Sequence, residues 1–155
     1  MTPEGAAFQK YIESARNAIM AELQDLPEEA LNWDLGIPET NSLFVSAFHP
    51  AGSINYFLVA LIGGGTLARD RDAEFRAAGD LATLTERWQE VVGNSRRELE
   101  KLSAEDFGSK RIPMMGGAGQ DWSVRECLLR IIEHANTHLG HIQLAKQLWQ
   151  DRAKK

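Results

Sequence analysis

Apolar residues recur at helical spacing near the start of the chain. From position 8 to position 26, one apolar side chain follows another every three or four residues, which places them on one face of an α-helix. Thr2 and Pro3 suit the N-cap and first turn of this helix, and Pro27 suits its end. The apolar positions that carry this prediction are Phe8, Ile12, Ala15, Ile19, Leu23 and Leu26.

A second helix is predicted from about Asn41 or Ser42 to Ile62, after an irregular connection over residues 28–41. It is apolar around most of its circumference, so we expect it to be largely buried. Three glycines at positions 63–65 end it. Its apolar residues are Leu43, Phe44, Val45, Phe48, Tyr56, Phe57, Leu58 and Leu61.

A third amphipathic helix is predicted around residues 84–102. Its N-terminus has two candidate signals, an N-cap at Asp80 or a capping box from Thr83 to Glu86, and the sequence does not decide between them. Its stripe consists of Leu84, Trp88, Val91, Ser95, Leu99 and Leu102.

The last helix is predicted from a capping box at Ser123 and Glu126 to about Arg152. A glycine-rich crossover over residues 103–121 precedes it, with room for one short strand pair. Four long helices joined by long connections predict an all-α four-helix bundle, with residues 1–155 as a single domain. The stripe of the last helix is Val124, Ile131, Ala135, Ile142, Ala145, Leu148 and Trp149.

Composition narrows the function classes. The chain has 155 residues, 43% of them apolar, which is enough for one domain with a core. Its net charge of −5 argues against a nucleic-acid partner, and a single cysteine, Cys127, excludes an internal disulfide and a cysteine-based zinc finger. The start lacks a signal-peptide pattern, and the longest apolar run, residues 56–62, is shorter than the roughly 20 residues that span a bilayer. We therefore expect a cytoplasmic protein with no membrane partner.

Three of the four histidines lie close together in the predicted last helix, at His134, His138 and His141. In an α-helix, His138 lies about 40° around the axis from His134, and His141 about 20° the other way, so all three are expected to face the apolar stripe. Imidazoles four residues apart lie about 6 Å apart along the axis, close enough to bind one metal ion. Imidazole suits zinc, nickel, copper or iron(II). His49, in the predicted second helix, could complete the set from across the bundle.

Each of these histidines also has an ordinary structural explanation. A pair spaced like His134 and His138 is a weak signal by itself, because histidines in helices often cap the helix, form hydrogen bonds or remain half-exposed. His49 could be a core or helix-end histidine bonded to backbone. However, three histidines in one core stripe are costly unless something satisfies them. The two features together favour a metal site.

Several other residues have two interpretations. Arg69, Arg71 and Arg111 lie near predicted connections and could hold an anionic cofactor, but solvated surface charge explains them more simply. Cys127 is about 10 Å from His134 along the helix axis, so it is interpreted as a small core residue. Residues 114–115, both methionine, with the glycines after them, are a candidate lid.

The tryptophans are interpreted as packing residues. Trp88 and Trp149 lie on helical stripes and are expected in the core, whereas Trp33 and Trp122 lie in or beside connections and are expected to cover the ends of the bundle.

Two segments resemble the DinB-like (DinB/YfiT) metalloprotein superfamily. Residues 41–58 contain His49 followed by small residues and an aromatic-rich stretch, as in the second helix of that superfamily. Residues 134–142 match its last-helix pattern, with two histidines four apart followed by a glycine and a glutamine-or-histidine position before an isoleucine. Residues 122–128 are similar to the opening of that helix. The resemblance covers residues 43–148.

The resemblance implies a four-helix bundle that holds one divalent transition metal, most readily zinc or nickel, on His49, His134 and His138. His141 falls where the superfamily often has glutamine, so it is expected to line the site rather than to ligate. Pro50 departs from the pattern: it removes a helical N–H and disfavours α geometry at His49, which could either aim or displace that imidazole. Characterised relatives imply transfer or isomerisation with low-molecular-weight thiols such as mycothiol or bacillithiol, and frequent homodimers.

Three hypotheses follow. Three protein ligands are a catalytic count, since structural zinc usually takes four. The first hypothesis is therefore a thiol-dependent transferase or isomerase, or a metal-dependent hydrolase, acting on a small-molecule substrate. The second is a non-catalytic metal-binding or stress-related interaction protein, in which the metal is structural or sensory and the bundle works through a partner surface. The third is a bundle that keeps the histidines but has lost the metal.

Overall fold

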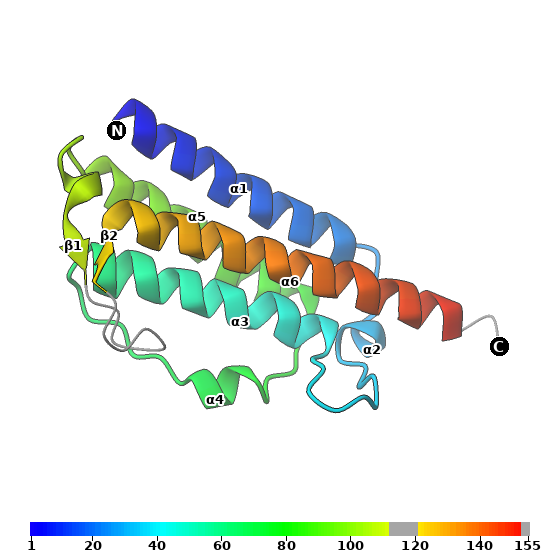
Figure 1. Ribbon diagram of the computed structural model, residues 1–155. Coiled ribbons are helices and arrows are strands. Elements are labelled where there is room, and N and C mark those ends of the chain that lie inside the picture. Colours follow the sequence, from blue (N-terminus) through cyan, green and yellow to red (C-terminus); the bar gives the residue numbers. More distant parts are fainter. Residues whose placement is uncertain (112–120, 153–155) are drawn as a thin grey trace.

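The computed structural model describes residues 1–111 and 121–152, in which four long helices form a bundle (Figure 1). These are α1 (Pro3–Leu23), α3 (Leu43–Tyr56), α5 (Leu81–Glu100) and α6 (Val124–Arg152), and α3 continues into the π-helical turns η1 (Phe57–Ile62). The short elements are α2 (Glu28–Leu31), α4 (Arg71–Glu74), the 3₁₀ turn η2 (Asp106–Gly108) and the strands β1 (Lys110–Arg111) and β2 (Trp122–Ser123). The predicted bundle of four long helices is confirmed.

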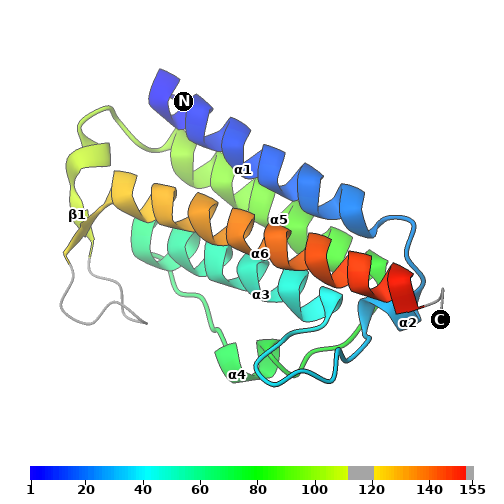
Figure 2. The same ribbon diagram turned by 45° about the vertical axis from the view of Figure 1, so that its right-hand side comes forward.

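The helices pack as two pairs that share a core. Both α1 and α3 pack against α5 and α6. Figures 1 and 2 show α3 and α6 side by side along the length of the bundle, with α4 on the outside of α3. Because α3 and α5 run in the same direction, the chain between them crosses back along the bundle through α4. This crossover brings α4 beside α3.

Helix starts follow the capping signals in the sequence. Ser42 caps α3, and the carboxylate of Asp80 accepts a hydrogen bond from the Thr83 backbone N–H at 2.8 Å, so Asp80 is the N-cap of α5. Ser123 and Glu126 form the predicted reciprocal capping box of α6, with bonds of 2.7 and 3.2 Å. Each cap satisfies backbone N–H groups that the first helical turn leaves unpaired.

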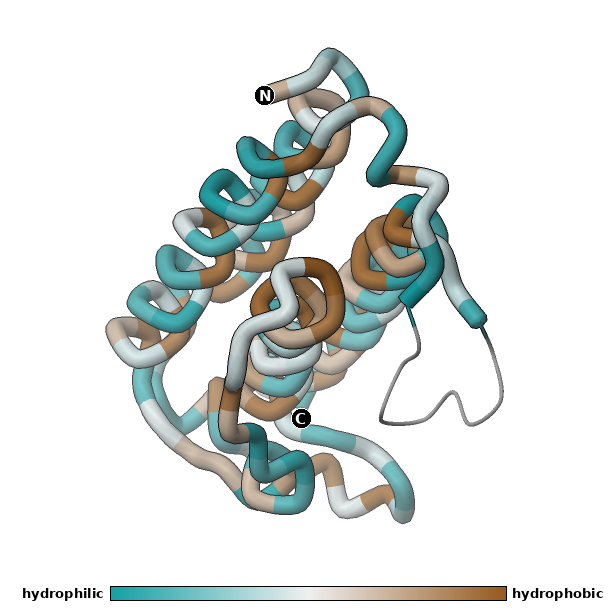
Figure 3. The backbone as a smooth tube through the Cα atoms, turned by 90° about the vertical axis from the view of Figure 1, so that its left-hand side faces the viewer, coloured by the Kyte–Doolittle hydropathy of each residue, from teal (hydrophilic) through white to brown (hydrophobic). Residues whose placement is uncertain are grey.

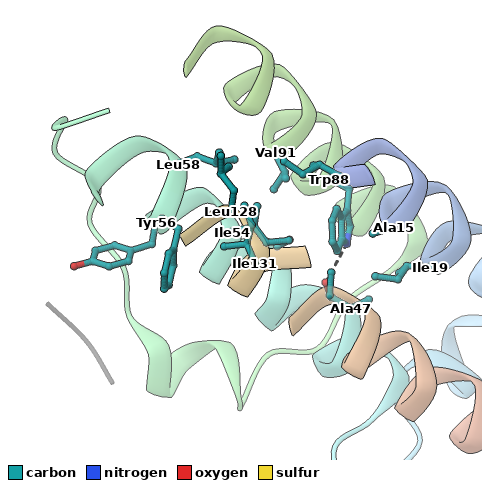
Figure 4. Packing of buried hydrophobic residues seen from close by; sticks show 14 of the residues in the cluster. Ala15, Ile19, Ala47, Ile54, Tyr56, Leu58, Trp88, Val91, Leu128 and Ile131 are labelled. Carbon is teal, nitrogen blue, oxygen red and sulfur yellow. Dashed lines mark hydrogen bonds between the residues drawn. The ribbon is translucent and has the colours of Figure 1, made fainter. Parts of the chain in front are cut away.

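The predicted apolar stripes form one core. In the end-on view of Figure 3, apolar positions concentrate on the helix sides that face one another. Trp88 is fully buried, and its indole N–H donates to the Ala47 carbonyl at 3.0 Å (Figure 4). Cys127 is also fully buried, and burial raises the pKa of its thiol to about 11, which agrees with a core role. The prediction for these two residues is confirmed.

The prediction is less accurate towards the end of α6 and in the connections. Leu148 is 39% exposed and Trp149 is only half-buried, packed edge-on against Trp33 at 5.6 Å, because the last turns of α6 extend past the end of the core. The irregular segment 28–41 contains the short helix α2. The expected short strand pair is present, with β1 antiparallel to β2. The candidate lid at residues 114–115 lies outside the described residues.

One span in the described part of the chain, Leu43–Ile62, is long and apolar enough to cross a membrane by length and composition. In the structure, 83% of its most apolar window is buried inside the protein. The span is therefore largely a core helix of the bundle, and such helices pass the same test of length and composition.

Candidate metal centre

His49 on α3 and His134 and His138 on α6 lie together between the two helices. One ring nitrogen from each lies within 4.8 Å of the others. Their ring centroids are 4.7 Å apart for His134 and His138, and 5.2 and 5.4 Å from His49 to the other two. The packing of α3 against α6 therefore unites residues that are 85 positions or more apart in the sequence.

The two histidines of α6 are left without hydrogen bonds. His134 Nε2 and His138 Nδ1 are buried and have no partner among the described residues. A buried polar nitrogen without a partner is costly. Burial, reinforced by repulsion from His49, lowers the pKa of His134 to about 4, and burial, reinforced by repulsion from His134, lowers the pKa of His138 to about 3.

Both imidazoles are therefore neutral near pH 7, with lone pairs available. A neutral imidazole is the form that ligates metal, and coordination would satisfy the nitrogens that are otherwise unpaired. The residues present thus fit a divalent transition metal, and the three-histidine group can hold one.

His49 is held differently, by the carboxylate of Glu74. Its Nδ1 lies 3.0 Å from Glu74 Oε2, which leaves Nε2 for another partner. Glu74 is only 4% exposed and also accepts hydrogen bonds from Arg69 at 2.7 Å and from Arg87 at 3.0 Å. Burial raises the pKa of Glu74, but hydrogen bonds from His49 and Arg69 offset this and leave it below its usual value. An ionised carboxylate behind a ligating histidine fixes the tautomer and orientation of the ring.

The sequence interpretation missed Glu74 and was wrong about Arg69. The simpler explanation of Arg69 as solvated surface charge is wrong, because its side chain is 8% exposed and bound to Glu74. Arg71 is exposed, as that explanation expects. One signal was available at Gly52, inside the predicted second helix. A Cβ at this position would lie 1.9 Å from Glu74 Oε1, so glycine makes room for the carboxylate.

Pro50 does not displace His49. It lies inside α3, which continues without a break to Tyr56, and His49 is 5% exposed within the histidine group. Proline lacks the N–H that would donate to the Ser46 carbonyl one turn earlier, so the helix omits one backbone hydrogen bond here.

His141 lies outside the three-histidine group. Its ring is 5.5 Å from that of His138, but its side chain is exposed, so the expectation that it faces the apolar stripe is wrong. It lies at the edge of the stripe, where the helix surface turns towards solvent. The Arg111 guanidinium donates a hydrogen bond to the Ser109 hydroxyl, and Arg111 does not line the cavity beside the histidines.

A cavity of about 670 Å³ opens beside the histidine group. Two of the three histidines border it, and aromatic and basic side chains form most of the rest of its wall. Figure 4 shows Tyr56 at this end of α3. A group of three candidate ligands with an adjacent cavity leaves space for a further small molecule. The residues that line the cavity include His49, Phe57, Arg71, Trp122, Arg130 and His134.

Comparisons with known proteins support the fold. The chain is similar to a conserved protein from Enterococcus faecalis whose crystal structure matches with a TM-score of 0.77 and 12% sequence identity, over 96% of this chain and 98% of that chain. A comparison with curated proteins finds no match. The model of the DinB superfamily matches residues 11–142, which include α3, α5 and all three histidines of the group. The chain therefore belongs to the DinB superfamily.

Proposed function

We propose that this protein is an enzyme that holds one divalent transition metal, zinc or nickel, on His49, His134 and His138. The reaction proposed is transfer or isomerisation with a low-molecular-weight thiol. The observation that carries the proposal is that the three-histidine group borders a cavity of about 670 Å³, a volume typical of small-molecule sites. When bound, the metal supplies Lewis acidity, which lowers the pKa of a coordinating water or thiol.

The residues of the chain have distinct roles in this proposal. Glu74 orients His49 and keeps its Nδ1 protonated, so that Nε2 is the ligating atom. Burial keeps His134 and His138 neutral, so both are ready to ligate without first losing a proton. The packed helices exclude water from the side of the group opposite the cavity, since His49 is 5% and His138 8% exposed.

The number of protein ligands distinguishes this proposal from its alternative, a non-catalytic metal-binding role. A structural site closes its shell with four protein ligands, and the described residues bring together three. A metal-dependent hydrolase would use the same site with water in place of a thiol.

The test is elemental analysis of untagged protein, run beside His49→Ala, His138→Ala and the control His141→Ala. We expect about one equivalent of metal in the wild type and in His141→Ala, and none in the other two variants, because His49 and His138 belong to the group and His141 does not. Absence of metal in the wild type, even after zinc or nickel is added, would overturn the proposal. Loss of metal in His138→Ala alone would remove His49 from the site.

A further inference from the structure

The cavity beside the histidines is basic, although the chain is acidic overall. Its lining residues include Arg69, Arg71 and Arg130 and no carboxylate in the described part of the chain, while the net charge of the protein is −5. A local excess of positive charge in an acidic protein needs an explanation, because nearby arginines repel one another.

Two of these three arginines have no buried counter-charge among the described residues. Arg69 is paired with the buried Glu74. Arg71 makes no ion pair with any described residue. Among the described residues, Arg130 forms an ion pair only with Glu133 on the outer surface, where the two side chains are 47% and 66% exposed and water screens the attraction.

Aromatic and helical contacts place both arginines next to the histidines. The Arg71 guanidinium lies over the Phe75 ring, 4.7 Å from its centroid, and the Phe75 ring is itself 4.3 Å from that of His49. Arg130 is four residues before His134 on α6, hence on the same helix face, and its charge is one of the causes that lower the pKa of His134. The two cations thus come from different elements, α4 and α6, and meet at one cavity.

The same cavity also has an apolar wall. Phe57 and Trp122 line it with their rings stacked at a centroid distance of 6.1 Å, and Ile131 adds an apolar side chain. The cavity therefore offers a wall for an apolar group and two guanidinium groups for an anion.

We infer that the small molecule bound beside the histidines is an organic anion, whose carboxylate or similar group binds Arg71 and Arg130 while its apolar part packs on Phe57 and Trp122. This inference rests on the proposed function and specifies its substrate class. Arg71 and Arg130 are binding residues in this assignment, and no bond is made or broken at them.

The experiment uses a matched pair of thiols, N-acetylcysteine and its neutral amide, with binding measured by calorimetry on the metal-loaded protein at pH 7. The variants are Arg71→Gln, Arg130→Gln and the double variant, with Arg16→Gln as the control, because Arg16 lies on α1 beside a different cavity. We expect the wild type and the control to bind the carboxylate about tenfold or more tightly than the amide. The double variant should bind both with similar affinity.

Equal affinity of the wild type for the two thiols, no measurable binding of either, or a preference that persists in the double variant would each overturn the inference. Repeating the titration after chelation separates it from the proposed function. Metal-loaded protein that binds both thiols equally would contradict the anion site alone. A protein that retains no metal but still prefers the carboxylate through Arg71 and Arg130 would contradict the metal site alone.

Discussion

The two helices that supply the histidines hold them in different ways. On α6, His134 and His138 lie one turn apart, and each has a buried nitrogen without a partner among the described residues. On α3, His49 is anchored by Glu74, which is bound in turn by Arg69 and by Arg87 of α5. Among the described residues, the α6 pair therefore has unpaired nitrogens, whereas Nδ1 of His49 is satisfied by Glu74.

The difference shows which half of the site destabilises the metal-free protein. The unpaired nitrogens of α6 destabilise the metal-free protein, and a metal would remove that cost. The network behind His49 is satisfied without metal but contains a buried carboxylate and a buried arginine, so removing one partner leaves a charge unpaired. Changes to the two halves should consequently have different effects on stability and on metal affinity.

The largest effect is expected from Glu74→Gln. It leaves Arg69 and Arg87 without their counter-charge, so we expect a loss of about 3–5 kcal/mol in the free energy of unfolding. Metal affinity should fall by about 10–100-fold, because His49 loses the carboxylate that orients it. A chelator competition assay below the melting temperature measures the affinity, with Glu13→Gln on α1 as the control. An unchanged affinity in folded Glu74→Gln would show that the carboxylate does not position His49.

A second effect concerns acid and the α6 pair. The folded pKa values of about 4 and 3 lie below the ordinary 6.5, so between these limits the unfolded chain binds more protons than the folded one. Stability of the metal-free protein is then fully present above pH 6.5 and is lost as the pH falls towards 4. We expect a loss of roughly 2–4 kcal/mol between pH 6.5 and pH 5.

Urea unfolding of chelated protein across this range measures the loss. The double variant His134→Gln/His138→Gln should show a flatter profile, because glutamine does not titrate. An equal slope in the double variant would assign the acid sensitivity to other groups.

Gly52→Ala should disturb the hydrogen-bond network behind His49 and leave the α6 pair unchanged. The new Cβ would lie 1.9 Å from Glu74 Oε1 and 2.4 Å from Arg87 Nη2, so the network must shift. We expect a net loss of about 1–2 kcal/mol in the free energy of unfolding, with weaker metal binding. Gly93→Ala is the matched control, since it also lies inside a helix, α5, and nothing is within 4 Å of its Cβ position. That variant should gain about 0.5–1 kcal/mol. If both variants gain stability, the close approach at Gly52 is not required.

The smallest effect is expected from Pro50→Ala. Alanine restores an N–H that can donate to the Ser46 carbonyl, which stabilises the folded protein. It also increases the conformational entropy of the unfolded chain, which opposes this gain, so the net change in the free energy of unfolding should be below about 1 kcal/mol. Metal content should not change, because Glu74 orients His49 independently of the proline ring. Loss of metal in this variant would show that Pro50 itself aims the imidazole.

Much of the bundle followed from local patterns. Stripes of apolar residues predicted four helices, the second from about Asn41 or Ser42, and the capping box at Ser123 marked the start of the last one, because helix formation depends on periodicity and on nearby hydrogen bonds. The predictions from the sequence are wrong at places without such local signals. Leu148 continues the periodic stripe but is exposed, since periodicity does not tell where the neighbouring helices end.

The sequence by itself determined the α6 half of the candidate site. Two histidines four residues apart on one helix lie together whatever else the chain does, because the helical repeat sets their separation. Only the tertiary structure decided the other half. The crossover through α4 carries Glu74 and Arg69 to a point beside His49, and α5 adds Arg87. No local spacing predicts these contacts, because they depend on how the helices pack and on the space that Gly52 leaves.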